Sequence, residues 1–298
     1  MNKKMLDYHR ELLGDEFPLF REWIKKPIRK SIRLNPIRTT PRDFRSELDI
    51  MGAEPLPWCK YGFRVDNRPW GATIPHQLGY FYVQEAASML PAVVLAPEHG
   101  DAVLDIAAAP GSKSTQIAPF CRTLVANDPD PERRKALVSN LERCGVMNAV
   151  VTHFDGLRFP TIMQFDRILV DVPCSNMGSA RKSPSVLKMW TPGFAKRISS
   201  LQKGLLRSAF KLLKPGGVLV YSTCTSSVEE NEAVILSLLE RFGEARLERV
   251  NARIKSRPGL LPGTERCMRI YPWDNDTEFF FVAKISKDIT ENELGTQL

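Results

Sequence analysis

The stretches ILVDVPCS (168–175) and VLVYSTCT (218–225) decide the fold of this chain. Each is a short apolar run rich in β-branched residues, typical of a buried strand in a parallel sheet, and each ends in polar residues with one cysteine. Ligands of open α/β sheets bind beyond the carboxyl ends of the strands. We therefore predict that Cys174 and Cys224 face one cleft and form a two-cysteine active site.

Strand and helix patterns alternate around these stretches, which predicts a doubly wound, mostly parallel α/β sheet. The predicted strands are 102–106, 123–127, 149–153, 167–172, 217–222 and 279–285, and the predicted helices are 114–120, 131–144, 192–213 and 228–242. The chain before this sheet predicts a helix at 1–27, a strand at 31–35, a helix at 41–51, a strand at 62–65 and a linker at 66–77. We therefore divide the chain into a basic N-terminal α+β module (1–75), a catalytic domain (76–286) and a polar tail (287–298).

Composition narrows the class of protein. The net charge is +8 and the pI is near 9.2, which fits either a polyanionic partner or a basic soluble enzyme. No apolar run approaches the roughly 20 residues of a membrane span, and the start, MNKK (1–4), does not lead into an apolar signal core, so we expect a cytoplasmic protein. The six cysteines form no CxxC pair and the four histidines are scattered, so we predict neither a metal site nor a disulfide framework.

The turn AAAPGSK (107–113), after the strand at 102–106, predicts a cofactor site. Small residues let the backbone approach a ligand, and Gly111 can adopt a positive φ, although such turns also serve packing alone. Asp128 and Asp155 follow the next two strands, where they could hold a ribose and an adenine amine, or act as a helix cap and a turn residue. The predicted residues of an adenosine-containing cofactor site are Ala107, Ala108, Ala109, Pro110, Gly111, Ser112, Lys113, Asp128, Arg133, Asp155 and Asp171.

Several motifs in order carry a family resemblance. AAAPGSK (107–113), DVPCS (171–175), YSTCT (221–225) and EFFFVAK (278–284) resemble the Sun/Fmu family of S-adenosylmethionine-dependent RNA cytosine-5 methyltransferases, whose catalytic domain is a Rossmann-like class I methyltransferase fold. The resemblance extends from about Ile28 to Ile285. Within the family, this chain is most similar to the catalytic part of bacterial small-subunit rRNA enzymes, whose PUA-like C-terminal region it does not include. The short length is more like archaeal tRNA members.

This chain departs from the family pattern at three positions. Val172 and Asn176 stand where the family usually has Ala and Gly, and Asp128 stands where it commonly has Glu. Asn tolerates a left-handed backbone, so the departure at Asn176 concerns the shape of the loop rather than the cysteine beside it.

The resemblance implies a covalent mechanism. It assigns Cys224 as the nucleophile that adds to carbon 6 of cytosine, and Cys174 to the later step that removes the carbon 5 proton or releases the enzyme. Asp171 could hydrogen-bond the base at nitrogen 3 and the amino group, with Lys113 as electrostatic support. S-adenosylmethionine is the implied methyl donor.

The same resemblance gives the basic segments an RNA partner. A stacked cytosine must be single-stranded or flipped to reach an active site, and basic side chains would hold the phosphates. A charge run is also commonly a solvated face. The predicted RNA contacts are Arg29, Lys30, Arg33, Asn35, Arg181 and Lys182.

We therefore expect a monomeric RNA cytosine-C5 methyltransferase that acts on rRNA or tRNA without a metal or a membrane. One alternative is a non-catalytic RNA-binding or ribosome-assembly protein that keeps the fold, for which Asn176 is the sequence hint. Another is a DNA or small-molecule methyltransferase, against which the second cysteine and the basic module argue.

Overall fold

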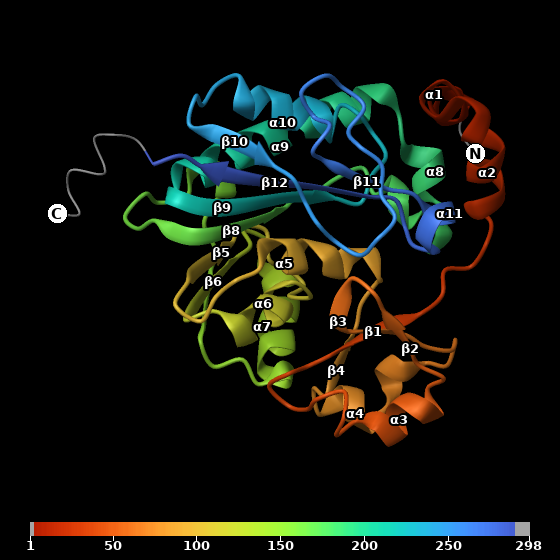
Figure 1. Ribbon diagram of the computed structural model, residues 1–298, viewed down its shortest axis with the longest axis vertical. Coiled ribbons are helices and arrows are strands. Elements are labelled where there is room, and N and C mark those ends of the chain that lie inside the picture. Colours follow the sequence, from red (N-terminus) through yellow and green to blue (C-terminus); the bar gives the residue numbers. More distant parts are fainter. Residues whose placement is uncertain (1–2, 290–298) are drawn as a thin grey trace.

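The structure is a computed structural model that describes residues 3–289, and its centre is one large twisted sheet (Figure 1). The strand order is β10-β12-β9-β8-β5-β6-β7, with β11 paired to β12. Strands β5 to β9 run parallel, whereas β12 is antiparallel to β9, β10 and β11. Their bounds are β5 Ala102–Asp105, β6 Thr123–Asn127, β7 Ala149–Thr152, β8 Phe165–Asp171, β9 Leu213–Thr223, β10 Ala245–Glu248, β11 Met268–Ile270 and β12 Phe280–Lys287. The predicted doubly wound, mostly parallel sheet is confirmed.

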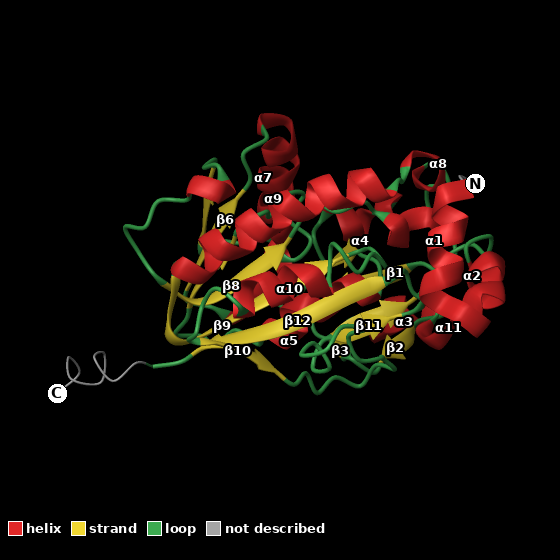
Figure 2. Ribbon diagram, turned by 90° about the horizontal axis from the view of Figure 1, so that it is seen from above, coloured by secondary structure: helices red, strands yellow, loops and turns green. Residues whose placement is uncertain are grey.

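Helices cover both faces of this sheet. Helices α9 (Pro192–Lys211) and α10 (Glu232–Leu239) lie over one face, as the view from above shows (Figure 2). Helices α5 (Leu90–Leu95), α6 (Ser114–Ile117) and α7 (Pro131–Cys144) cover the other (Figure 1). Within β8, Ile168 and Val170 join the core under α9, and Leu169 joins the core under α5. Both faces are buried, which explains why the strands are continuous apolar runs.

Helix α7 has the bounds predicted from sequence, because its ends carry strong local signals. The side chain of Asp130 caps it by accepting hydrogen bonds from the backbone N–H of Glu132 and Arg133, with Pro131 in the first turn. Gly145, with φ of +73°, ends it in the left-handed conformation. These caps fix where Arg133 lies relative to the end of β6.

The small N-terminal sheet has the antiparallel order β2-β3-β1-β4. Its strands are β1 Ser31–Leu34, β2 Glu54–Leu56, β3 Cys59–Arg64 and β4 Phe81–Val83, accompanied by the helices α3 Arg45–Ile50 and α4 Ile74–Gln77. Because β4 pairs with β1, the small sheet extends to Val83, beyond the boundary predicted at residue 75. The predicted linker also contains α4.

The predicted helix at 1–27 is two helices, α1 (Lys3–Leu13) and α2 (Phe17–Trp23), separated at Gly14, which has φ of +52°. They do not pack on the small sheet. Phe20 of α2 shares an apolar cluster with Trp190 and Phe279 of the catalytic part. The N-terminal segment is therefore part of the catalytic body, next to α8 (Val186–Met189) and α11 (Pro272–Asn275) (Figure 1). Most of the predicted tail, residues 290–298, lies outside the described residues.

Candidate active site

One cavity of about 650 Å³ lies at the carboxyl ends of β5, β8 and β9. Both Cys174 and Cys224 line it, together with the turn after β5. The sulfur atoms of the two cysteines are 3.0 Å apart. The predicted convergence of the two thiols on one hollow is therefore present in the structure.

Strand register brings the two cysteine loops together. Asp171 at the end of β8 pairs with Ser222 of β9, and both chains continue past this pair into the loops. The loops are then joined by a hydrogen bond between the Ser175 and Thr225 hydroxyl groups at 3.0 Å. The backbone N–H of Ser175 also donates to the Glu230 carboxylate at 2.8 Å. Glu230 lies in the segment VEEN (228–231), where the predicted helix start is wrong because α10 begins only at Glu232.

Gly178 lets the loop after β8 pack closely against the Cys224 loop and the residue before β12. The N–H of Gly178 donates to the carbonyl oxygen of Cys224 at 2.8 Å. A Cβ atom at Gly178 would lie 2.4 Å from the carbonyl oxygen of Phe279 and 2.8 Å from that of Cys224. Any side chain there would push the two cysteine loops apart, so Gly178 is a requirement of the site that the motifs alone did not show.

The surroundings of Cys224 favour its neutral form. The hydrogen bond with Cys174 raises the pKa of Cys224 well above its ordinary value, and burial and the nearby carboxylates of Glu278 and Asp171 raise it further. The side-chain oxygen of Asn176 lies 3.1 Å from the Cys224 sulfur and 3.5 Å from the Cys174 sulfur. Formation of the Cys224 thiolate therefore requires a change in this environment.

A buried ion pair forms one wall of the cavity. The Lys113 ammonium lies 2.7 Å from one oxygen of Asp171, and the Ser222 hydroxyl donates to the other at 2.6 Å. Burial opposes the charged form of Lys113, but the charge and hydrogen bond of Asp171 outweigh it and raise the pKa of Lys113. A permanent ammonium group therefore lines the same cavity as the thiols.

Asp105 is a buried carboxyl group behind this pair that the sequence analysis did not single out. Burial raises the pKa of Asp105 to about 7, and the charge of Asp171 adds to the shift. The Ser114 hydroxyl donates to one of its oxygens at 2.6 Å, which partly opposes it. The signal that could have identified Asp105 is an acidic residue near the end of the apolar strand predicted at 102–106.

The turn after β5 presents mainly backbone and small side chains to the cavity. Its lining members are Ala107, Ala109, Pro110, Ser112 and Lys113. Ala108 instead packs in the core beneath the sheet, and Gly111 has φ of +101°, as the sequence predicts for this position. A Cβ atom at Gly111 would also lie 3.0 Å from the Leu137 side chain of α7, so only glycine fits well.

The two acidic strand ends differ from each other. Asp128 is fully buried, and one of its oxygens accepts from the Ala109 N–H at 3.3 Å and pairs with Arg133 at 3.2 Å. Arg133 lines the cavity and also donates to the Ala109 carbonyl at 2.6 Å. Asp155 is exposed, accepts from the Leu157 N–H at 3.0 Å, and caps a short turn. The predicted ligand roles of these residues stay predictions.

Two of the predicted RNA contacts, Arg33 in β1 and Asn35 directly after it, face the protein interior, which corrects the prediction. The Arg33 guanidinium is buried and donates to the Ser112 carbonyl at 2.6 Å, to the Thr115 hydroxyl at 2.8 Å and to Gln84. The Asn35 amide donates to carbonyl oxygens of Gly79 at 2.9 Å and Cys144 at 2.7 Å. Both side chains are buried and their terminal nitrogen atoms already donate inside the fold, so neither side chain is available to a phosphate.

Arg181 requires the same correction. Its side chain is 2% exposed and pairs with Asp276 at 2.7 Å. It also donates to the carbonyl oxygens of Lys26 at 3.0 Å and Pro27 at 2.8 Å. Arg181 therefore joins the segment after α2 to the segment before β12 instead of facing solvent.

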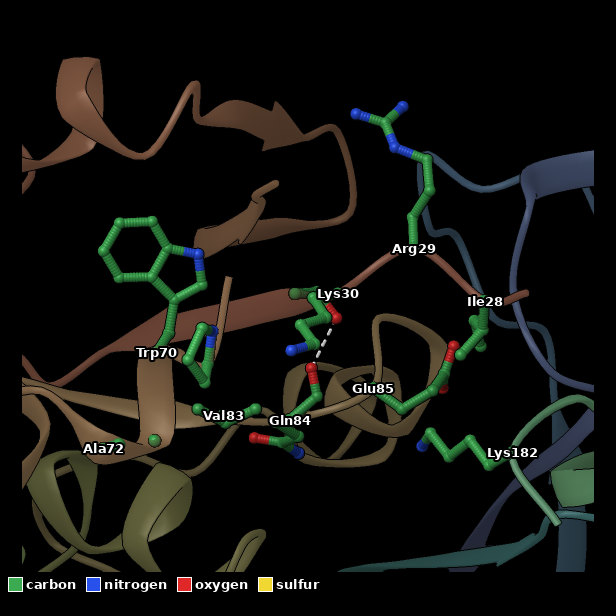
Figure 3. A pocket seen from close by; sticks show the side chains of 12 residues that line it. Ile28, Arg29, Lys30, Trp70, Ala72, Val83, Gln84, Glu85 and Lys182 are labelled. Atoms are coloured by element: carbon green, nitrogen blue, oxygen red, sulfur yellow. Dashed lines mark hydrogen bonds between the residues drawn. The ribbon is translucent and has the colours of Figure 1, made fainter. Parts of the chain in front are cut away.

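The other three predicted contacts line a second groove of about 370 Å³. Figure 3 shows Lys182 pointing toward Glu85 at one end of this groove and Trp70 at the other. Arg29 and Lys30, from the segment before β1, also line the groove, and the Lys30 ammonium donates to the Asn67 carbonyl at 2.9 Å. The groove and the active-site cavity share Val83, Gln84, Glu85 and Lys182 as lining residues. The two hollows therefore adjoin, with Lys182 at their junction.

No helix among residues 3–289 has both the length and the apolar composition that a membrane span requires. In the same part of the chain, no group of three or more His, Cys, Asp or Glu side chains could hold a metal ion.

Comparison with known proteins identifies the family. Residues 92–286 match the family described as 16S rRNA methyltransferase RsmB/F, and residues 1–86 match the N-terminal domain of 16S rRNA methyltransferase RsmF. The chain belongs to the RsmB/F methyltransferase family. This confirms the family predicted from the motifs, and the two matches meet near the end of β4 rather than at residue 75.

Named relatives of this RsmB/F member include enzymes for two kinds of RNA. Ribosomal RNA small subunit methyltransferase F of Vibrio parahaemolyticus is 44% identical over 277 residues, which cover 88% of this chain and 58% of the relative. This chain thus spans 58% of the length of that relative. The tRNA (cytosine(49)-C(5))-methyltransferase of Pyrococcus abyssi is 40% identical and covers 96% of both chains. A crystal structure of a methyltransferase homolog from Pyrococcus horikoshii is 31% identical with a TM-score of 0.83, covering 97% of this chain and 100% of that one.

Proposed function

We propose that this RsmB/F member transfers a methyl group from S-adenosylmethionine to carbon 5 of a cytosine in RNA, through a covalent bond between Cys224 and carbon 6. The observation that carries the proposal is the pair of thiols 3.0 Å apart in one cavity with the turn after β5. A relative that is 40% identical over nearly its whole length is named for methylation of cytosine at C5.

The residues around the turn fit S-adenosylmethionine. Small side chains at Ala107, Ala109 and Ser112 leave the backbone open to a nucleoside, and only glycine fits well at Gly111. The buried Asp128 carboxylate, with Arg133 over it, offers polar partners for a ribose. When bound, S-adenosylmethionine supplies an electrophilic methyl group to the cavity.

The thiols divide the remaining chemistry between them. Carbon 5 of cytosine is a weak nucleophile, and addition of the Cys224 thiolate to carbon 6 moves electron density onto carbon 5. Both thiols must first release their protons to solvent, so that Cys224 can add to carbon 6 and Cys174 can act as a base. After carbon 5 has gained its methyl group, the Cys174 thiolate accepts the carbon 5 proton. Loss of that proton restores the ring double bond and expels the Cys224 thiolate, which regains a proton from solvent, so that one proton is released per methyl group transferred.

The buried ion pair stabilises the charge that develops on the ring. Asp171 can accept a hydrogen bond from the cytosine amino group, and the Lys113 ammonium keeps further donors for nitrogen 3. Both groups are fixed before the base arrives, because the Ser222 hydroxyl and the ion pair hold the carboxylate in place. A positive group near Cys224 also favours its thiolate, opposing the effect of the neighbouring thiol.

The RNA strand reaches the cavity along the adjoining groove. A target base must leave its stack, and the groove offers Arg29, Lys30 and Lys182 for the flanking phosphates. Lys182 lies at the junction with the cavity, so it is placed beside the nucleotide that carries the target base.

The direct test is methyl transfer with tritiated S-adenosylmethionine to small-subunit rRNA and to a tRNA transcript, each lacking prior modification. We expect tritium in one of the two RNAs, and bisulfite sequencing should place it at carbon 5 of a single cytosine. Binding of RNA without tritium transfer to either would support a non-catalytic RNA-binding protein. Bisulfite-sensitive cytosines in a methylated product would place the methyl group at another atom.

Cysteine variants test the covalent mechanism. Cys224→Ala should abolish turnover without forming an RNA adduct, because no thiolate adds to carbon 6. Cys174→Ala should instead accumulate an RNA adduct that survives denaturation, because the carbon 5 proton is not removed. Denaturing gel electrophoresis separates the two outcomes, and the opposite pattern would exchange the assigned roles.

A further inference from the structure

Asn176 lies between the two cysteines of the cavity and has no role in the chemistry described so far. Its side-chain oxygen is 3.1 Å from the Cys224 sulfur and 3.5 Å from the Cys174 sulfur. One carboxamide oxygen carries two lone pairs, and because each thiol has a single proton, the two S–H groups can make two of the three contacts among Asn176, Cys174 and Cys224 at a time. Asn176 is therefore in direct contact with the atom that reacts.

The backbone holds Asn176 in a conformation that few residues adopt. Its φ is +55° and its ψ is +26°, in the left-handed region, where glycine and asparagine are favoured. Its carbonyl oxygen accepts from the N–H of Ser179 at 2.9 Å and from the Ser179 hydroxyl at 2.8 Å. The backbone is thus fixed by the turn that follows, and a glycine could replace Asn176 without changing it.

We propose that Asn176 is a further catalytic residue, whose carboxamide oxygen accepts a hydrogen bond from the Cys224 thiol and keeps that thiol protonated until the substrates are bound. The proposal rests on the proposed function, in which Cys224 must lose its proton before it adds to the base. Only a protonated thiol can donate to the amide oxygen, so this contact stabilises the resting pair and not the thiolate.

The charged groups around Cys224 set the background for this contact. Asp171 and Glu278 disfavour its thiolate, and Lys113 favours it. Lys182 pairs with Glu278 at 3.0 Å and reduces the effect of that carboxylate. A substitution at Asn176 leaves all four of these groups in place, so its effect on the thiol can be measured separately.

The test compares Asn176→Gly with Asn176→Asp. The glycine variant keeps the left-handed backbone and removes the amide, and the aspartate variant keeps the size and adds a charged acceptor. Iodoacetamide alkylation of the protein alone is followed from pH 6 to 11 by mass spectrometry of tryptic peptides, since Cys174 and Cys224 fall on separate peptides. The plateau rate at high pH reports access to the sulfur, and the midpoint reports ionisation.

We expect the midpoint for Cys224 to fall in Asn176→Gly and to rise in Asn176→Asp. Loss of one hydrogen bond corresponds to roughly a 2- to 10-fold faster alkylation below the midpoint. An unchanged or higher midpoint in Asn176→Gly would overturn the proposal, because the amide would then be idle or would donate to the thiolate. A change confined to the plateau would also overturn it, because only access would have changed.

The alkylation needs neither RNA nor S-adenosylmethionine, so it separates this inference from the proposed function. If the midpoints shift as expected but no variant methylates RNA, the hydrogen bond stands and the proposed function fails. If the protein methylates RNA and the midpoints do not move, the proposed function stands and the role of Asn176 fails. If both hold, the pH at which single-turnover methyl transfer is half-maximal should also fall in Asn176→Gly.

Discussion

The carboxyl edge of the main sheet and the small N-terminal sheet were both predicted to be functional surfaces, and they differ sharply in the structure. At the sheet edge, Asp171, Cys174 and Cys224 line one cavity, as their positions after two neighbouring strands indicated. In the small sheet, Arg33 and Asn35 turn inward and bind carbonyl oxygens of the catalytic domain. A strand end was thus a better guide to a site than a basic run.

Topology explains the difference. The carboxyl ends of parallel strands meet at one edge, so a residue after such a strand has few places to lie. A basic side chain in an antiparallel strand can face solvent or a neighbouring domain, and its charge does not distinguish the two. In β1, Ile32 and Leu34 pack in the core of the small sheet, and Arg33 points the other way, toward the turn after β5. The small sheet therefore supports the cofactor turn.

Among the variants at the carboxyl edge of the main sheet, Lys113→Met should reduce methyl transfer the most. Removing the ammonium leaves the Asp171 carboxylate in the cavity with only Ser222 as partner, and removes a charge that favours the Cys224 thiolate. We expect single-turnover methyl transfer to fall about 100- to 1000-fold. Lys135→Met, on the exposed surface of α7, is the matched control. A loss below threefold would show that the ion pair is structural only.

Arg33→Met tests whether the small sheet positions the cofactor turn. The variant leaves the Ser112 carbonyl and the Thr115 hydroxyl without this donor, so the turn should loosen. Burial lowers the pKa of Arg33 to about 10, so the side chain is charged at neutral pH and its removal is a large change. We expect S-adenosylmethionine affinity to fall about 10- to 30-fold by calorimetry, and the free energy of unfolding to fall by about 3 kcal/mol.

Asn35→Ala is the control for Arg33→Met. Asn35 lies in the same chain segment and is equally buried, but its partners are the carbonyl oxygens of Gly79 and Cys144, away from the turn. It should lower the free energy of unfolding in urea without changing cofactor affinity. Equal loss of affinity in both variants would mean that Arg33 acts through stability alone.

The sequence predicted six of the eight strands of the main sheet, because these six are apolar and alternate with helices. It missed β10 and β11 of that sheet, and also β4 and α5, since elements as short as Phe81–Val83 show no period. It joined α1 and α2 because their apolar spacing continues across Gly14. The short strand β4 also explains the wrong boundary at residue 75, because β4 closes the small sheet against β1.

In the candidate site, backbone conformations that depend on residue type were predictable from the sequence. The hydrogen-bond partners of long side chains were not. The left-handed conformation of Asn176 and the positive φ of Gly111 follow from residue type. The burial of Arg33 and Arg181 depends on carbonyl oxygens far away in sequence, such as Ser112 and Lys26, which no local pattern reveals.

Asp105→Asn tests the buried carboxyl group behind the ion pair. Its pKa is raised from 3.8 to about 7 in the folded protein, so the folded state binds more protons than the unfolded state between these values. The free energy of unfolding should therefore fall as the pH rises from 4 to 7. The substituted amide stays neutral, so the variant should be more stable than the parent at pH 8, by roughly 4 kcal/mol, and the difference should vanish near pH 4.

Urea denaturation across this pH range measures the effect of Asp105→Asn. Asp7→Asn, on the exposed face of α1, is the matched surface control. A difference for Asp105→Asn that stays constant from pH 4 to 8 would contradict a buried, proton-binding carboxyl group. It would also mean that burial at the sheet edge does not raise the pKa of the Asp105 carboxyl group.

Arg181 and Lys182 are adjacent basic residues with the same predicted role in RNA binding, but one side chain is buried and the other is partly exposed. Lys182 is about half exposed at the junction of the groove and the cavity, and Arg181 is buried. Lys182→Gln should weaken binding of a fluorescein-labelled small-subunit rRNA fragment by about two- to fivefold and reduce the salt dependence by about one phosphate contact. Arg181→Met should lower the free energy of unfolding and leave the salt dependence unchanged, since its donors never reach a phosphate. Anisotropy titrations from 50 to 300 mM KCl distinguish the two, and a reduced salt slope in Arg181→Met would restore that residue as an RNA contact.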